Sequence, residues 1–162
     1  ALVSHGPSTV PKYIVDEINA MGGELTNTYG ISIEELKAAI PAGISKINVD
    51  TDIRLAVTRN MKELFAKYPE KRTSASIGPI YELLETKKNQ FDPRVFLPPI
   101  MDTVMYGNVP DEDVAAIVSC VERGVKEVVG TLIVEFGSFG KAPLVEQVSL
   151  DEMAERYKKM EK

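Results

Sequence analysis

Ser45-Lys46-Ile47-Asn48-Val49-Asp50-Thr51-Asp52 is the stretch that decides the fold, because a compact strand passes there directly into a helix. The strand is expected over residues 45–49, and the polar residues 50–52 close it. The helix that follows presents one apolar stripe at a spacing of three and four residues, formed by Val57, Met61, Leu64, Phe65 and Tyr68.

A second strand-to-helix unit stands at the start of the chain. Residues 1–4 form a short apolar run, and the next helix is expected to be capped by Ser8 or Thr9, to carry Pro11 in its first turn and to end at Gly22-Gly23. Because parallel sheets are buried on both faces, two parallel strands cannot stand alone. The sequence therefore predicts a slice of a larger α/β sheet or barrel.

The remainder of the sequence is predicted to be mainly helical. The clearest pattern is a helix over residues 111–136, in which apolar residues keep a single face. Shorter helices are expected after the capping boxes at 32–35 and 149–152 and over residues 80–87, with a turn at 91–96.

Composition excludes several classes of protein. The chain has 162 residues, 44% hydrophobic and 27% charged, which is typical of one globular domain. Its net charge of −5 argues against nucleic-acid binding, and no apolar run approaches the roughly 18 residues of a membrane span. Cys120 is the single cysteine, which fits a reducing cytoplasm, and with His5 as the single histidine the chain cannot build an all-histidine metal site.

The first candidate site follows the first strand, in the sequence His5-Gly6-Pro7-Ser8. In α/β barrels the carboxyl ends of the strands carry the chemistry. A histidine there is able to ligate a metal, a glycine lets a ligand approach the backbone, and Ser8 stands before a helix whose free N–H groups attract phosphate. The alternative is a surface histidine followed by an ordinary helix cap.

The second candidate site follows the second strand. Residues two apart in a strand point to the same side, so Asn48 and Asp50 are expected to share one side of a site. The asparagine amide suits a substrate oxygen, and Thr51 and Arg54 are candidate anion ligands at the start of the helix. The alternative is that residues 50–52 merely cap the helix and that Arg54 is a solvated charge.

A third candidate is Arg94, within the turn at 91–96. An arginine on an ordered loop suits bidentate recognition of phosphate. The alternative is a structural role, in which Arg94 pairs with Asp92 or a carbonyl group. Cys120 lies beside the apolar face of the 111–136 helix and is expected to be a buried, inert thiol.

Three segments, in this order, resemble the C-terminal half of the class II, zinc-dependent fructose-1,6-bisphosphate aldolases: residues 2–11, 46–54 and 91–94. Gly22-Gly23 and Thr28-Tyr29-Gly30 add to the resemblance, which is specific to about residue 97 and looser in the tail. The family is a (β/α)8 TIM barrel, a cytoplasmic lyase of glycolysis and gluconeogenesis. It reversibly cleaves the bisphosphate into dihydroxyacetone phosphate and glyceraldehyde 3-phosphate.

The resemblance implies a division of the chain and a role for each candidate residue. Residues 1–97 would be the C-terminal portion of the TIM-barrel catalytic domain, with its last two strands, and 98–162 a helical C-terminal extension and dimerisation region. His5 would be a zinc ligand, and Asn48 a catalytic residue that contacts dihydroxyacetone phosphate at its reacting end. Substrate and phosphate binding is implied for Gly6, Ser8, Asn48, Asp50, Thr51, Arg54 and Arg94.

Partners also follow from the resemblance. Arg94 would reach a phosphate of the neighbouring subunit's substrate, which implies a homodimer or a higher homo-oligomer. The backbone at Gly6 would help to hold a monovalent cation, Na+ or K+. Two departures stand out: Pro7 replaces a small residue and removes one N–H from the phosphate cradle, and residues 72–90 look like an insertion.

The family's other zinc ligands and its acid–base residues belong to its N-terminal half. Because a catalytic zinc takes three protein ligands, we expect this chain to be inactive in isolation and to be a fragment that works with the missing N-terminal half. The residues do not separate fructose from tagatose 1,6-bisphosphate as substrate. A non-catalytic half-barrel that binds a phosphosugar or a protein is the remaining alternative.

Overall fold

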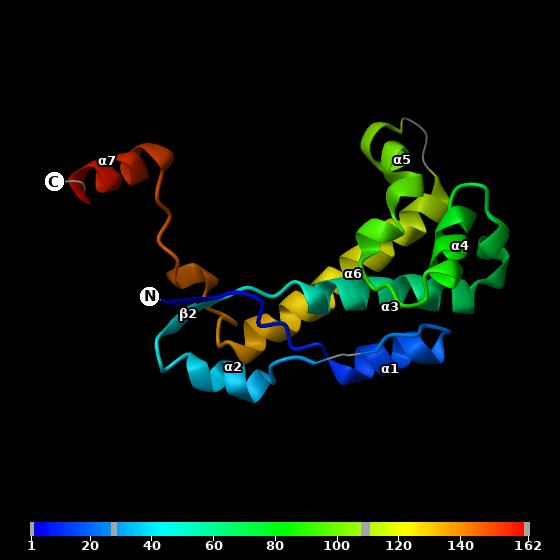
Figure 1. The fold of residues 1–162 in the computed structure, drawn as a ribbon. Helices are drawn as coiled ribbons and strands as arrows, with labels where there is room; N and C mark the ends of the chain where they lie inside the picture. Colours follow the sequence, from blue (N-terminus) through cyan, green and yellow to red (C-terminus); the bar gives the residue numbers. More distant parts are fainter. Residues whose placement is uncertain (1, 27–28, 108–110, 161–162) are drawn as a thin grey trace.

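The computed structural model describes residues 2–26, 29–107 and 111–160 (Figure 1). Ala1, from the predicted first strand, and Thr28, from the family resemblance, lie outside these ranges. The strands β1 (Leu2–Ser4) and β2 (Ile44–Ile47) pair in parallel, with Leu2 opposite Ile44 and Ser4 opposite Ile47. The structure is therefore α/β, with the two predicted strands as neighbours.

The rest of the described chain is mainly helical. The short helices α1 (Lys12–Ala20) and α2 (Ile33–Ala39) lie between the two strands in sequence, and α3 (Thr51–Lys67) follows β2. After α3 come α4 (Gly78–Thr86), α5 (Met101–Tyr106), α6 (Glu112–Glu135) and α7 (Leu150–Met160). Short 3-10 turns stand at Pro69–Thr73, Pro93–Val95, Pro98–Ile100 and Ala142–Leu144.

The helix α3 is the central helix of the molecule. It lies between α1 and α6 and runs alongside α6 for much of its length (Figure 1). One buried cluster joins α3 and α4 to the first half of α6, and a second joins α1 and the first turns of α3 to Val128 of α6. The core thus continues across the predicted boundary at residue 97, and the division into two regions stays a prediction.

Several sequence expectations are confirmed. Ser32 and Glu35 form the capping box of α2 in both directions, and Asp111 caps α6 by accepting from Asp113 and Val114. Cys120 is fully buried, and burial raises the pKa of its thiol. The segment 72–90 packs Ile77, Ile80 and Leu84 into the core, and its status as an insertion stays a prediction.

Other expectations are wrong. The first helix is not capped by Ser8 or Thr9: its N-cap is Pro11, without a side-chain hydrogen bond, because both hydroxyls bond to α3 instead. The second strand ends at Ile47 rather than at residue 49. The 3-10 turn at Pro69–Thr73 and the helix α5 were not foreseen.

The helix α7 stands apart from the body of the molecule (Figure 1). Its residues are all exposed, and its apolar side chains Leu150, Met153, Tyr157 and Met160 recur at spacings of three and four. Within the described ranges, none of the helices combines the length and the apolar character needed to cross a bilayer.

Gly124 allows α6 to approach α3 closely. A Cβ at Gly124 would lie 2.7 Å from the backbone nitrogen of Val57 and 2.9 Å from its Cα. These are backbone atoms of another helix, so a side chain would have to push the two helices apart. The glycine, which costs helix propensity, is therefore required by packing.

We predict that Gly124→Ala lowers the free energy of unfolding by about 1–3 kcal/mol, because overpacking a helix crossing forces backbone shifts. Gly130→Ala is the matched control on the same helix, since an added Cβ there meets nothing within 4 Å. It should raise the free energy of unfolding by about 0.5–1 kcal/mol through helix propensity. Urea unfolding followed by circular dichroism measures both; equal stabilisation by the two alanines would contradict the packing role.

Candidate functional site

The carboxyl ends of β1 and β2 bring His5 and Asn48 into contact. The Asn48 amide N–H donates to the Ser4 carbonyl at 3.1 Å, which continues the strand pairing by one residue. The Asn48 side-chain Nδ2 lies 3.0 Å from His5 Nδ1. Because the amide nitrogen is a donor, Nδ1 is the acceptor in this contact. His5 is exposed and Asn48 is half-buried, so both line an accessible surface.

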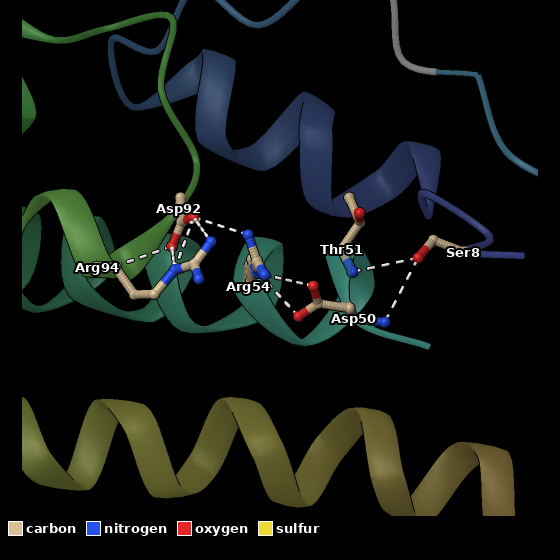
Figure 2. Close-up of polar contacts among 6 residues, drawn as sticks. All are labelled: Ser8, Asp50, Thr51, Arg54, Asp92 and Arg94. Atoms are coloured by element: carbon tan, nitrogen blue, oxygen red, sulfur yellow. Dashed lines mark hydrogen bonds and ion pairs between the residues drawn. The ribbon is translucent and has the colours of Figure 1, made fainter. Parts of the chain in front are cut away.

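The loop after β1 closes the N-terminal end of α3. The backbone N–H of Thr51 donates to the Ser8 hydroxyl at 3.1 Å, and that of Asp50 points to the same oxygen at 3.5 Å (Figure 2). Asp50 is the N-cap of α3 but its own side chain makes no capping bond. Ser8 therefore caps this 17-residue helix from another segment and keeps its hydroxyl proton for donation.

A chain of charges runs from Asp50 to Arg94 (Figure 2). The guanidinium of Arg54 donates through Nε to Asp50 at 2.8 Å and through a second nitrogen to the other Asp50 oxygen. Its third nitrogen donates to Asp92 at 2.7 Å. Arg94 donates to the same Asp92 through Nε at 3.0 Å and through a terminal nitrogen at 2.6 Å. Asp92 thus holds two guanidinium groups together.

These contacts lower the pKa of Asp92 from 3.8 to about 2. The side-chain hydrogen bond from Arg94 is the largest cause, with further contributions from the Arg94 backbone N–H and the charge of Arg54, against an opposing effect of burial. Its carboxylate is therefore charged at any physiological pH. The pairing of Arg94 with Asp92 is the structural alternative that the sequence left open.

Strand alternation, from which Asn48 and Asp50 were expected to share one side of the site, does not apply to these two residues. Since β2 ends at Ile47, both residues lie beyond the strand, where strand alternation no longer applies. Asn48 contacts His5, whereas Asp50 is engaged by Arg54. Gly6, with φ at +73°, turns the chain between these two parts of the site.

Two residues that the sequence did not single out belong to this region. Asp52 is 1% exposed and accepts hydrogen bonds from Thr9 and Val10 of the loop after β1. Asp92 was considered only as a partner for Arg94. Both lie beside candidate residues in sequence, and that proximity is the signal that could have found them.

His5 supplies one imidazole ligand, and because its Nδ1 electron pair accepts from Asn48, a metal bound at Nδ1 would have to replace that hydrogen bond. Within the residues that the structure describes, no three side chains of histidine, cysteine, aspartate or glutamate gather as a metal site. A catalytic zinc takes three protein ligands, so this part of the chain does not by itself fit a complete zinc site.

The arrangement defines an α/β protein whose polar groups gather at the carboxyl ends of adjacent parallel strands, where such folds place their chemistry. The sequence matches the family described as "Fructose-bisphosphate aldolase class-II" over residues 1–141, well past residue 97. The chain belongs to the class II fructose-bisphosphate aldolase family.

Several similar proteins are named fructose-bisphosphate aldolase. The fructose-bisphosphate aldolase of Xanthobacter flavus is 34% identical over 156 residues, which cover 96% of this chain and 33% of that protein. The fructose-bisphosphate aldolase of a Nostoc species is 34% identical over 160 residues, covering 99% and 33%. That of Giardia intestinalis is 33% identical over 157 residues, covering 97% and 36%. The chain spans about a third of the length of these curated relatives.

We predict that the carboxyl carbon of Asp92 titrates near pH 2 in a carbon-13 NMR experiment on the folded chain. Because its pKa is depressed on folding, Asp92 stabilises the fold above about pH 4, and this contribution is lost as the pH falls toward 2. Arg94→Met should raise the midpoint toward 3.8, whereas Arg123→Met on α6, whose guanidinium hydrogen-bonds to Cys120, should not. A midpoint near 3.8 in the unaltered chain would contradict the network.

Proposed function

We propose that this chain is the C-terminal part of a class II fructose-bisphosphate aldolase, and that it contributes to the reversible aldol cleavage of fructose 1,6-bisphosphate. The observation that carries the proposal is the meeting of His5 with Asn48 and of Ser8 with Thr51 at the ends of neighbouring parallel strands. The family membership and the shared name of the relatives support it. In this reading β1 and β2 are the last two strands of a TIM barrel.

In the proposed site, His5 is one ligand of a zinc ion whose other ligands come from the rest of the enzyme. Zinc supplies Lewis-acid polarisation of the substrate ketone when it is bound. Asn48 lies beside His5, and its amide, which carries both a donor nitrogen and an acceptor oxygen, is the group that would hydrogen-bond a substrate oxygen. Its place next to the metal ligand supports a role at the reacting end of dihydroxyacetone phosphate.

The phosphate of that fragment would bind where the loop after β1 meets α3. The Ser8 hydroxyl has a proton to donate, and the N–H groups of Asp50 and Thr51 lie at the positive end of the α3 dipole. The backbone at Gly6, which turns between His5 and Ser8, would complete the cradle and hold a monovalent cation. A phosphate held there fixes the distance from its sugar carbons to Asn48, which converts binding energy into orientation.

The arginines would add positive charge beside this cradle. Arg54 is tied to Asp50 and Asp92, so its first effect is to hold Asp50 in place. Arg94 has a side chain that is 71% exposed, and it is the group proposed to reach a second phosphate across a subunit boundary in a homodimer or larger oligomer. To do so it would exchange part of its contact with Asp92 for the phosphate oxygens.

The test is an aldol-cleavage assay on the complete enzyme that contains this chain, with fructose and tagatose 1,6-bisphosphate as separate substrates. We expect cleavage of the fructose ester, loss of activity with a chelator and recovery with Zn2+. Asn48→Ala should lower kcat by about 100-fold or more, as expected for loss of a group that stabilises developing charge. Asn19→Ala, far from the site in sequence but also a hydrogen-bonded asparagine, is the matched control.

Preference for the tagatose ester would favour the epimeric alternative. Retention of full activity by Asn48→Ala, or cleavage unaffected by the chelator, would contradict the proposed mechanism. Binding of a phosphosugar without any cleavage by the complete enzyme would favour the non-catalytic half-barrel.

A further inference from the structure

The loop Ser8–Val10 is held from one side by a buried carboxylate. Asp52 Oδ2 accepts from the Thr9 backbone N–H at 3.0 Å and from the Thr9 hydroxyl at 2.8 Å, and Oδ1 accepts from the Val10 N–H at 2.7 Å. Asp52 is 1% exposed and lies in the first turn of α3. Hydrogen bonds to a charged acceptor are among the stronger ones in proteins, so this contact ties the loop firmly to α3.

The same loop contains a strained residue. Val10 has a φ of 47°, a value that β-branched side chains rarely adopt. Such strain persists only where the surrounding structure imposes it, and it concentrates at functional sites. The Asp52 carboxylate bonds directly to the Val10 N–H, so it opposes relaxation of this residue.

The backbone at Gly30 and Ile31 makes a second contact with this loop. The Ile31 N–H donates to the Ser8 carbonyl at 3.1 Å, and a Cβ at Gly30 would lie 2.0 Å from the Thr9 carbonyl oxygen and 2.9 Å from that of Ser8. The φ of Gly30 lies outside the left-handed range, so the backbone conformation itself does not require glycine. Glycine is required there because the backbone at Gly30 lies so close to the Ser8 and Thr9 carbonyl groups.

The Asp52 hydrogen bonds and the Gly30–Ile31 contact both act on the backbone of Ser8–Val10, next to the Ser8 hydroxyl. That hydroxyl bonds to the Thr51 N–H, one residue before Asp52. We propose that Asp52 and Gly30 are positioning residues, which hold the Ser8–Val10 loop in the strained conformation that aligns the Ser8 hydroxyl with the amide end of α3. The consequence for phosphate affinity rests on the proposed function. The contacts of Asp52 and Gly30 with the loop, called the clamp below, do not.

The first test uses Asp52→Asn, which keeps one acceptor oxygen and loses the other, with Asp16→Asn, at an exposed position of α1, as the matched control. Two quantities are measured: hydrogen exchange of the Thr9, Val10 and Thr51 amides in this chain, and kcat and KM of the complete enzyme. We expect Asp52→Asn to accelerate exchange at all three amides and to raise KM about tenfold or more, with kcat changed much less. Unchanged exchange and KM would overturn the proposal.

A rescue experiment separates positioning from general stability. Glycine at position 10 adopts a φ of 47° without strain, so Val10→Gly added to Asp52→Asn should bring KM back toward the original value. The same change removes a side chain packed against the core of α1 and α3, so the stability of the fold should fall further. A KM that worsens together with stability would contradict a positioning role.

Gly30→Ala tests the clamp without touching Asp52, and it keeps the proposal testable if the Asp52 variant does not fold. The added Cβ must displace the Thr9 carbonyl, so exchange at Thr51 should accelerate and KM should rise, while Gly130→Ala, with open space around it, changes neither. Normal KM and exchange in Gly30→Ala would overturn the role of Gly30. Should the unaltered complete enzyme cleave no ketose bisphosphate, the proposed function fails, and the exchange measurements still decide the clamp.

Discussion

The parallel pairing of β1 with β2 is the constraint on which the rest of the structure depends. After an irregularity between Leu2 and Val3, the parallel pairing sets Val3 opposite Lys46 and Ser4 opposite Ile47, so the residues after Ser4 and after Ile47 meet. The short distances between His5 and Asn48 and between Ser8 and Thr51 follow directly from that register. A shift of one residue would turn the side chains of one strand to the opposite face and separate these pairs.

The helix α3 connects the site to the core. Its first turn carries Thr51, whose N–H meets Ser8, and the buried Asp52, which holds the preceding loop. Its middle is fixed by the close approach of Gly124 and by apolar side chains on both sides. Because the same rigid helix carries the site residues in its first turn and the core contacts in its middle, packing over the later turns sets the positions of the polar groups at its start.

Local patterns in the sequence were sufficient to predict much of the fold. The Ser32–Glu35 capping box, the long amphipathic pattern of α6 and the change from strand to helix at residue 50 each depend on neighbouring residues alone. The candidate residues His5, Asn48, Ser8 and Thr51 are brought together in space, as expected for groups at the ends of adjacent strands. Their chemical roles stay predictions.

What the sequence could not reveal depends on contacts between distant segments. Ser8 looks like a cap for its own helix, but its hydroxyl meets the amide of Thr51, 43 residues away. Gly124 looks like a weak point in a helix until Val57 is placed against it. Asp52 looks like an ordinary first-turn acid, and only the path of the earlier loop shows that its carboxylate is enclosed by Thr9 and Val10.

We propose that the loop after β1 and the start of α3 form one phosphate-binding site. The most direct measurement is a titration of nitrogen-15-labelled chain with dihydroxyacetone phosphate, with sodium sulfate and sodium chloride titrations as controls for a general anion effect and for ionic strength. We expect the amide signals of Ser8, Asp50 and Thr51 to shift together along one saturation curve, at lower concentrations than with either salt. Independent curves for the two segments, or shifts no larger than those caused by the salts, would contradict it.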